Sequence, residues 1–154
     1  MSELFDLTGK KAIITGSSKG IGKSIAKAMA LHGAEVVISS RKADVCQETA
    51  DEINEACKDG PGKAIVIPCN ISDKAALEML VEETRIQHGE IDIFVCNAAT
   101  NPFFGSIKDI PDEAFEKIMN NNIKSNHNLC QMVIPEMVER EDGNIISVSS
   151  IGGM

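Results

Sequence analysis

The stretch KAIITGSSKGIG, residues 11–22, decides the fold class, because it joins a short apolar run to a glycine-rich turn and then to a helical pattern. In this turn Gly16 permits a sharp bend, and Gly20 permits a close backbone approach to a phosphate. Gly22 lets the helix pack closely on the strands, and the free N–H groups at the helix start favour an anion. The unit therefore predicts a site for a nucleotide pyrophosphate.

Short apolar runs alternate with longer amphipathic stretches along the rest of the chain. The runs predict strands over residues 11–15, 35–39, 63–68, 91–96 and 144–149. Because they are too apolar to have a solvated face, we expect parallel strands with helices on both sides. Right-handed crossovers then give a Rossmann-like, doubly wound α/β sheet. No linker interrupts residues 1–154, so we expect one dinucleotide-binding domain.

The helical patterns give more detailed expectations. The first, over 20–32, predicts a stop at Gly33 and an inward face made of Ile21, Ile25, Ala28 and Met29. The second, over 42–58, predicts an acidic solvated face. The third starts at the cap pair Ser72-Asp73 and predicts a buried face made of Leu77, Leu80, Val81 and Thr84. The fourth runs from Pro111 to about residue 139, with a kink expected at Pro135.

Composition and charge narrow the classes of function. The net charge is −8, which argues against nucleic acid and against an anionic membrane as partners. The N-terminus is too polar for a signal peptide, and no apolar run approaches the roughly 20 residues of a membrane span. The five cysteines form no CxxC pair, which argues against a zinc ribbon and a disulfide scaffold. We therefore expect a protein of a reducing compartment, the cytoplasm.

The end of the second predicted strand bears on the choice of cofactor. A dinucleotide site that prefers NAD places an acidic residue about 20 residues after the glycines. Here the corresponding sequence is SSRK, residues 39–42, which has no carboxylate. The guanidinium of Arg41 suits a 2′-phosphate, and Lys19 adds a second cation. The sequence therefore predicts NADP. A Rossmann-like methyltransferase is an alternative, but it also expects an acidic residue here.

The spacing of Gly16, Gly20 and Gly22 resembles that of the short-chain dehydrogenase/reductase family, and four further motifs agree in order. These are NISD at 70–73, NAA at 97–99, NNIKS at 121–125 and NIISVSS at 144–150. Two positions depart from the family pattern, since the family more often has Asp at position 70 and Gly at position 99. The resemblance implies a cofactor-binding set made of Gly16, Ser18, Lys19, Gly20, Ile21, Gly22, Arg41, Asn70, Ile71 and Asn97.

The same resemblance implies a reaction. The family transfers a hydride between a nicotinamide cofactor and a carbonyl or alcohol substrate. Ser150 would hydrogen-bond the substrate oxygen, and Asn122 would hold a water of the proton relay. The segment NAATNPFFGSI, residues 97–107, is similar to the NADP-dependent carbonyl and retinal reductase branch. The resemblance also implies that the complete protein is a homo-oligomer.

One absence limits this prediction. The family's proton donor is a Tyr in a YxxxK motif that follows the serine, and the 154 residues contain no Tyr. We interpret the chain as the N-terminal part of such an enzyme, with its sheet truncated after the fifth strand, and expect these residues alone to be inactive. The alternative is a nucleotide-binding module without turnover.

Overall fold

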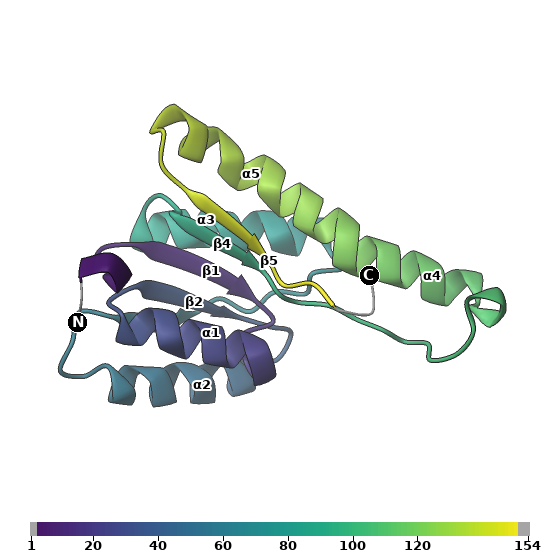
Figure 1. The fold of residues 1–154 in the computed structure, drawn as a ribbon, viewed down its shortest axis with the longest axis horizontal. Coiled ribbons are helices and arrows are strands. Elements are labelled where there is room, and N and C mark those ends of the chain that lie inside the picture. The colour runs from purple at the N-terminus through teal and green to yellow at the C-terminus, as the bar shows by residue number, and fades with distance from the viewer. Residues whose placement is uncertain (1–2, 151–154) are drawn as a thin grey trace.

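A parallel five-stranded sheet forms the centre of the protein. The computed structural model describes residues 3–150, and its strands follow the order β3-β2-β1-β4-β5 (Figure 1). Their bounds are β1 (Lys11–Thr15), β2 (Glu35–Ser39), β3 (Lys63–Val66), β4 (Ile93–Cys96) and β5 (Asn144–Ser147). The predicted Rossmann-like α/β fold is thus confirmed. Three strands are two residues shorter than predicted, although single backbone hydrogen bonds, such as that from Val148 N to Cys96 O, continue beyond their ends.

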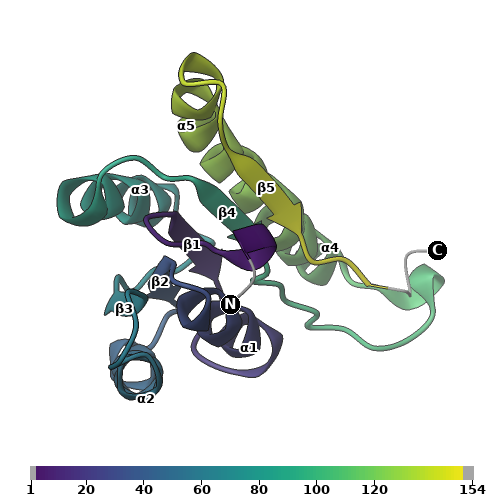
Figure 2. The ribbon, with the colours of Figure 1, turned by 60° about the vertical axis from the view of Figure 1, so that its left-hand side comes forward.

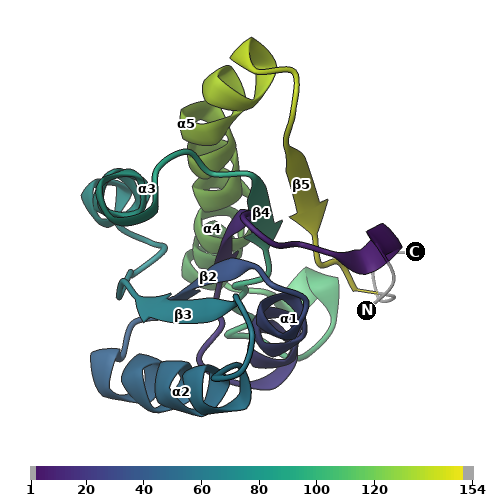
Figure 3. The same cartoon turned by 90° about the vertical axis from the view of Figure 1, so that its left-hand side faces the viewer.

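Helices cover the sheet on two sides. The longer ones are α1 (Gly20–Leu31), α2 (Ala43–Ala56), α3 (Lys74–His88), α4 (Asp112–Ile118) and α5 (Ser125–Glu139). Short 3₁₀ turns form η1 (Glu3–Phe5) and η2 (Ile107–Asp109), and a π-helical segment, η3 (Met119–Lys124), joins α4 to α5. Figures 2 and 3 show α1 and α2 on one side of the sheet and α3 and α5 on the other. None of the helices within residues 3–150 is both long and apolar enough to cross a membrane.

Successive strand residues alternate between two buried cores, as the period of a strand requires. Ile14 and Ile38 pack with the buried residues of α1 and α2. Ile13, Val37 and Phe94 pack on the opposite side with α3 and α5. The central strands are therefore buried on both faces, which explains why their sequences read as continuous apolar runs.

Helix α1 packs differently from the prediction. Its buried positions are Gly22, Ala26 and Ala30, whereas Ile21 is 65% exposed and Ala28 is also exposed. Assigning Ile21 and Ala28 to the inward face was therefore wrong, although the other two predicted positions, Ile25 and Met29, pack partly on the core. The physical reason is that small residues allow the helix to approach the sheet closely, so the smallest face packs inward.

The remaining helix predictions have mixed outcomes. Gly33 follows the C-cap of α1 with a φ of 101°, as expected for a helix stop. Asp73 caps α3 by accepting a hydrogen bond from Ala75 N, and the four predicted residues of α3 are buried. The predicted fourth helix is not one α-helix. The π-helical segment η3, which contains the asparagine run, interrupts it. Helix α5 continues through Pro135. Pro111 is the N-cap of α4 instead of its first residue.

The outer edge of the sheet is exposed. Strand β5 pairs with β4 only, and all four of its residues are solvent-exposed. Ile145 and Ile146 are 39% and 43% exposed. The rim of the sheet beside β5 is thus an apolar surface.

Candidate functional site

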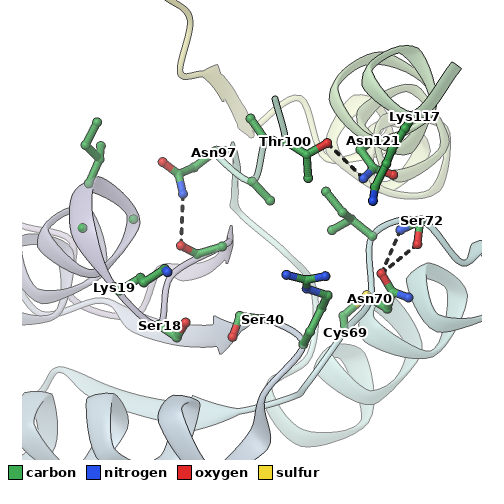
Figure 4. A pocket seen from close by; sticks show the side chains of 18 residues that line it. Ser18, Lys19, Ser40, Cys69, Asn70, Ser72, Asn97, Thr100, Lys117 and Asn121 are labelled. Atoms are coloured by element: carbon green, nitrogen blue, oxygen red, sulfur yellow. Dashed lines mark hydrogen bonds between the residues drawn. The ribbon is translucent and has the colours of Figure 1, made fainter. Parts of the chain in front are cut away.

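A cavity of about 560 Å³ opens at the carboxyl ends of the strands, where the chain leaves β1 for one side of the sheet and β4 lies on the other (Figure 4). In open α/β sheets, ligands bind at such a switch point of the strand order. The lining comes from the turn after β1, the ends of β2 and β3, the loop after β4, and the α4–η3 helix. Its residues are Gly16, Ser18, Lys19, Gly20, Ile21, Gly22, Ser40, Arg41, Cys69, Asn70, Ile71, Ser72, Asn97, Ala98, Ala99, Thr100, Lys117 and Asn121.

The glycine-rich turn forms one wall of this cavity, and its glycines are required by geometry. Gly16 and Gly20 have φ angles of 67° and 57°, which L-residues with side chains adopt rarely. At Gly22 the constraint is space, because a Cβ there would lie 2.5 Å from both Asn97 Nδ2 and Gly16 O. The turn therefore leaves its backbone open toward the cavity at the N-terminus of α1.

Hydrogen bonds hold the turn against the end of β4. The buried Thr15 hydroxyl accepts hydrogen bonds from the backbone N–H groups of Asn97 and Ala98, each at 3.1 Å. The Asn97 side chain returns two hydrogen bonds, to Thr15 O at 2.8 Å and to Gly16 O at 3.2 Å. The two segments that flank the switch point therefore form one rigid unit.

The charge of the cavity lining opposes that of the whole chain. Its basic residues are Lys19, Arg41 and Lys117, and no acidic residue occurs among the described residues that line it. Lys19, in the turn before α1, and Lys117, on α4, lie on opposite sides of the cavity (Figure 4). With a net charge of −8 on the chain, this local excess of cations favours an anionic ligand in the cavity.

A tight turn after β3 forms a second wall. Asn70 Oδ1 accepts hydrogen bonds from the Ser72 hydroxyl at 2.8 Å and from Ser72 N at 3.3 Å. Cys69 is buried beneath this turn, and its burial, with a smaller contribution from Asp73, raises the pKa of the thiol to about 11. The Cys69 thiol is therefore protonated at neutral pH and acts as a packing group.

The π-helical segment is tied to the loop after β4 by two neighbouring asparagines. Asn122 uses both ends of its amide on the backbone of Thr100, accepting from Thr100 N at 2.8 Å and donating to Thr100 O at 3.0 Å. Asn121 is 4% exposed and donates to the Thr100 hydroxyl at 3.2 Å. Asn121, and not Asn122, faces the cavity.

Comparisons with known proteins agree with this geometry. Residues 10–154 match the family model described as short chain dehydrogenase. The chain belongs to the short-chain dehydrogenase/reductase family. It is 40% identical over 146 residues to "Dehydrogenase/reductase SDR family member 4" of Bos taurus, an alignment that covers 94% of this chain and 50% of that protein.

Solved structures of the short-chain dehydrogenase/reductase family share the fold. A crystal structure of a short-chain type dehydrogenase/reductase from Mycobacterium marinum superposes with a TM-score of 0.87 at 36% identity, covering 97% of this chain and 59% of that one. A metagenomic short-chain oxidoreductase in complex with NADP gives a TM-score of 0.86 at 29% identity, covering 96% and 65%. The chain spans about half the length of the curated relatives it matches. It is thus a member of an oxidoreductase family that uses nicotinamide cofactors and acts on small molecules.

The structure brings the ten predicted cofactor-binding residues of this family together, since all of them line the cavity. The two predicted catalytic residues are not in its lining. The side chain of Asn122 is hydrogen-bonded to the backbone of Thr100, and Ser150 is an exposed residue three positions after the end of β5. Eight lining residues were not in the predicted set: Ser40, Cys69, Ser72, Ala98, Ala99, Thr100, Lys117 and Asn121. The last two are four residues apart, a helical spacing that places them on one face, but nothing local relates that face to the glycine turn.

Proposed function

We propose that residues 1–154 form the dinucleotide-binding domain of an NADP-dependent oxidoreductase of the short-chain type. The observation that carries this proposal is the cavity at the switch point, which combines a glycine-rich turn with three cations and no acidic residue among its described lining. An NAD-preferring site would offer a carboxylate to the ribose, whereas this one offers the fork of donors of Arg41.

The residues of the cavity fit a dinucleotide phosphate. The turn around Gly20 and Gly22 would hold the pyrophosphate, because its backbone is free of Cβ atoms where close approach is needed. Arg41 and Lys19 would hold the 2′-phosphate by charge-assisted hydrogen bonds. Asn70 and Ile71 would contact the base, and Asn97 would support the turn toward the nicotinamide end. Ser18 and Ile21 complete the wall on the side of α1.

The chemistry depends on the proton as well as on the cofactor. A bound nicotinamide supplies or accepts the hydride. By family resemblance Ser150 would hydrogen-bond the substrate oxygen, and Asn122 would position a water. The family assigns proton transfer to a Tyr, and the 154 residues contain none. We therefore propose that these residues bind the cofactor without turnover. The second candidate function, a nucleotide-binding module, leads to the same expectation for these 154 residues.

For the whole protein we propose a small carbonyl or alcohol substrate and a homo-oligomeric state. The support is the family and the segment 97–107, with its similarity to the carbonyl and retinal reductase branch. The five cysteines are free thiols, which supports a reducing compartment, for which we propose the cytoplasm.

Titration of the cofactor tests the proposal. We expect NADPH to bind with a Kd about 10–100-fold below that of NADH, as measured by the change in the fluorescence of the cofactor itself. The difference comes from charge-assisted hydrogen bonds to the 2′-phosphate, which lose part of their strength by exposure to solvent. Arg41→Ala should remove most of this difference. Lys42→Ala is the matched control, since Lys42 is the next cation along the chain and does not line the cavity. Equal affinities for both cofactors would overturn the assignment of NADP.

A further inference from the structure

Ser40 lies beside Arg41 in the cavity wall, and its hydroxyl is hydrogen-bonded to the thiol of Cys46. Ser40 Oγ is 3.1 Å from Cys46 Sγ, and Cys46 is fully buried in the first turn of α2 that faces the sheet. The backbone of Ser40 is held as well, because its carbonyl accepts a hydrogen bond from Cys69 N at 3.0 Å and a longer one from the Cys46 thiol at 3.8 Å. Ser40 therefore presents its side chain to the ligand from a fixed backbone, with Cys46 as the side-chain partner.

The protons of this pair matter for the ligand. The hydroxyl and the thiol carry one hydrogen each, and either sulfur or oxygen can be the donor between them. A phosphate dianion offers acceptors only, so Ser40 binds it by turning its own hydrogen toward the phosphate. The oxygen of Ser40 is then free to accept the hydrogen of Cys46, whose other acceptor is the Ser40 carbonyl at 3.8 Å. A ribose hydroxyl both donates and accepts, so it makes no such demand on the thiol.

We propose that Cys46 is a positioning residue for cofactor choice, which selects the 2′-phosphate by keeping the Ser40 hydroxyl in its donating orientation. This inference rests on the proposed function, since it assumes that the ribose end of the cofactor lies between Ser40 and Arg41. Cys46 itself is buried and does not line the cavity. Its effect on binding passes entirely through Ser40.

The experiment measures binding of the adenosine end of the cofactor to the 154-residue chain. Adenosine 2′,5′-bisphosphate and 5′-AMP are titrated by calorimetry, and the ratio of their Kd values is compared between variants. Both Cys46→Ala and Cys46→Val remove the hydrogen-bond donor; the alanine also removes side-chain volume, whereas the valine keeps it. Cys46→Ser keeps a donor. Cys57→Ala is the matched control, because Cys57 is a buried cysteine at the other end of the same helix, outside the cavity.

We expect Cys46→Ala and Cys46→Val to weaken binding of the bisphosphate about three- to fivefold, on the scale of one modest hydrogen bond. Binding of 5′-AMP should stay within about twofold, and Cys46→Ser should retain the selectivity of the unaltered chain. The ratio is taken within each variant, so a lower folded fraction cancels. If one variant does not fold, the other still gives the ratio.

Two results would overturn the proposal. An unchanged ratio in both donor-free variants, whether neither ligand or both ligands bind more weakly, would limit Cys46 to packing. A Cys46→Ser variant as unselective as Cys46→Ala would show that donation is irrelevant. Failure of the proposed function looks different: the unaltered chain itself would then show no preference for the 2′-phosphate, and Arg41→Ala would change nothing.

Discussion

Asn97 Nδ2 donates to the carbonyl oxygen of Thr15 at 2.8 Å, although the two residues are 82 positions apart in the sequence. The bond joins the last residue of β1 to the first residue after β4. With the two bonds that the Thr15 hydroxyl accepts, it makes the glycine-rich turn and the loop after β4 a single wall. The helix after the turn can approach this wall only because residue 22 is a glycine.

Gly22→Ala should therefore damage the wall itself. The new Cβ would lie 2.5 Å from Asn97 Nδ2 and Gly16 O, so backbone or the Asn97 side chain has to move. We expect a loss of about 1–3 kcal/mol in the free energy of unfolding, the range for overpacking, and a loss of cofactor binding. Urea unfolding and NADPH titration measure the two effects. Gly60→Ala is the control, because its nearest neighbour is 3.6 Å away; equal behaviour of the two variants would contradict the prediction.

Acid should weaken the fold partly through Glu35, at the start of β2. Partial burial acts to raise the pKa of Glu35, but hydrogen bonds from His88 and Lys63 outweigh it and hold the pKa below its usual value of 4.5. A carboxylate with a depressed folded-state pKa contributes stability at neutral pH, and this contribution is lost as the pH falls below about 4.5.

Glu35→Gln should therefore unfold more easily at pH 7 and lose less stability between pH 6 and pH 3 than the unaltered chain. Urea midpoints across this pH range provide the measurement. Glu55→Gln serves as the control, since Glu55 forms an exposed ion pair with Lys58. The same pH slope in Glu35→Gln and in the unaltered chain would refute the role of Glu35.

The exposed edge strand should make the 154-residue chain prone to association. Ile145 and Ile146 of β5, and Val148 just after it, are between 36% and 43% exposed, and unpaired apolar edges pair with other chains. Ile146→Lys should raise solubility and lower light scattering at a given concentration. Ile86→Lys, at an exposed position of α3 away from β5, should have a smaller effect. A monomeric, cooperatively melting and highly stable unaltered chain would count against this prediction.

Turnover should need more than these 154 residues. We expect the chain to oxidise NADPH with aldehydes, ketones or diketones at a rate at least 10²–10⁴-fold below that of a fusion with the C-terminal half of a 40% identical relative, the range for a general acid. Ser150→Ala in the fusion should lower kcat strongly. Rates within about tenfold of each other for chain and fusion would refute the family mechanism here.

The amino-acid sequence alone determined the architecture and one side of the candidate site. Apolar runs of strand length determine the central strands β1, β2 and β4, because strands buried on both faces are apolar along most of their length. The turn at residues 15–22 is likewise encoded locally, since Gly16 and Gly20 have positive φ angles that only glycine adopts at low cost. Arg41 could be placed at the cavity because it lies two residues after the end of β2, which is the strand next to β1.

Tertiary structure decided the rest. Lys117 and Asn121 reach the cavity only because the chain returns along the sheet after β4. The hydrogen bond between Asn122 and the backbone of Thr100 joins residues 22 positions apart. The face that α1 buries also depended on its distance from the sheet, so Ile21 is exposed while Ala26 is buried. Periodicity describes which residues share a face, but the partner of that face is set by contacts between distant segments. A local pattern contains no record of those contacts.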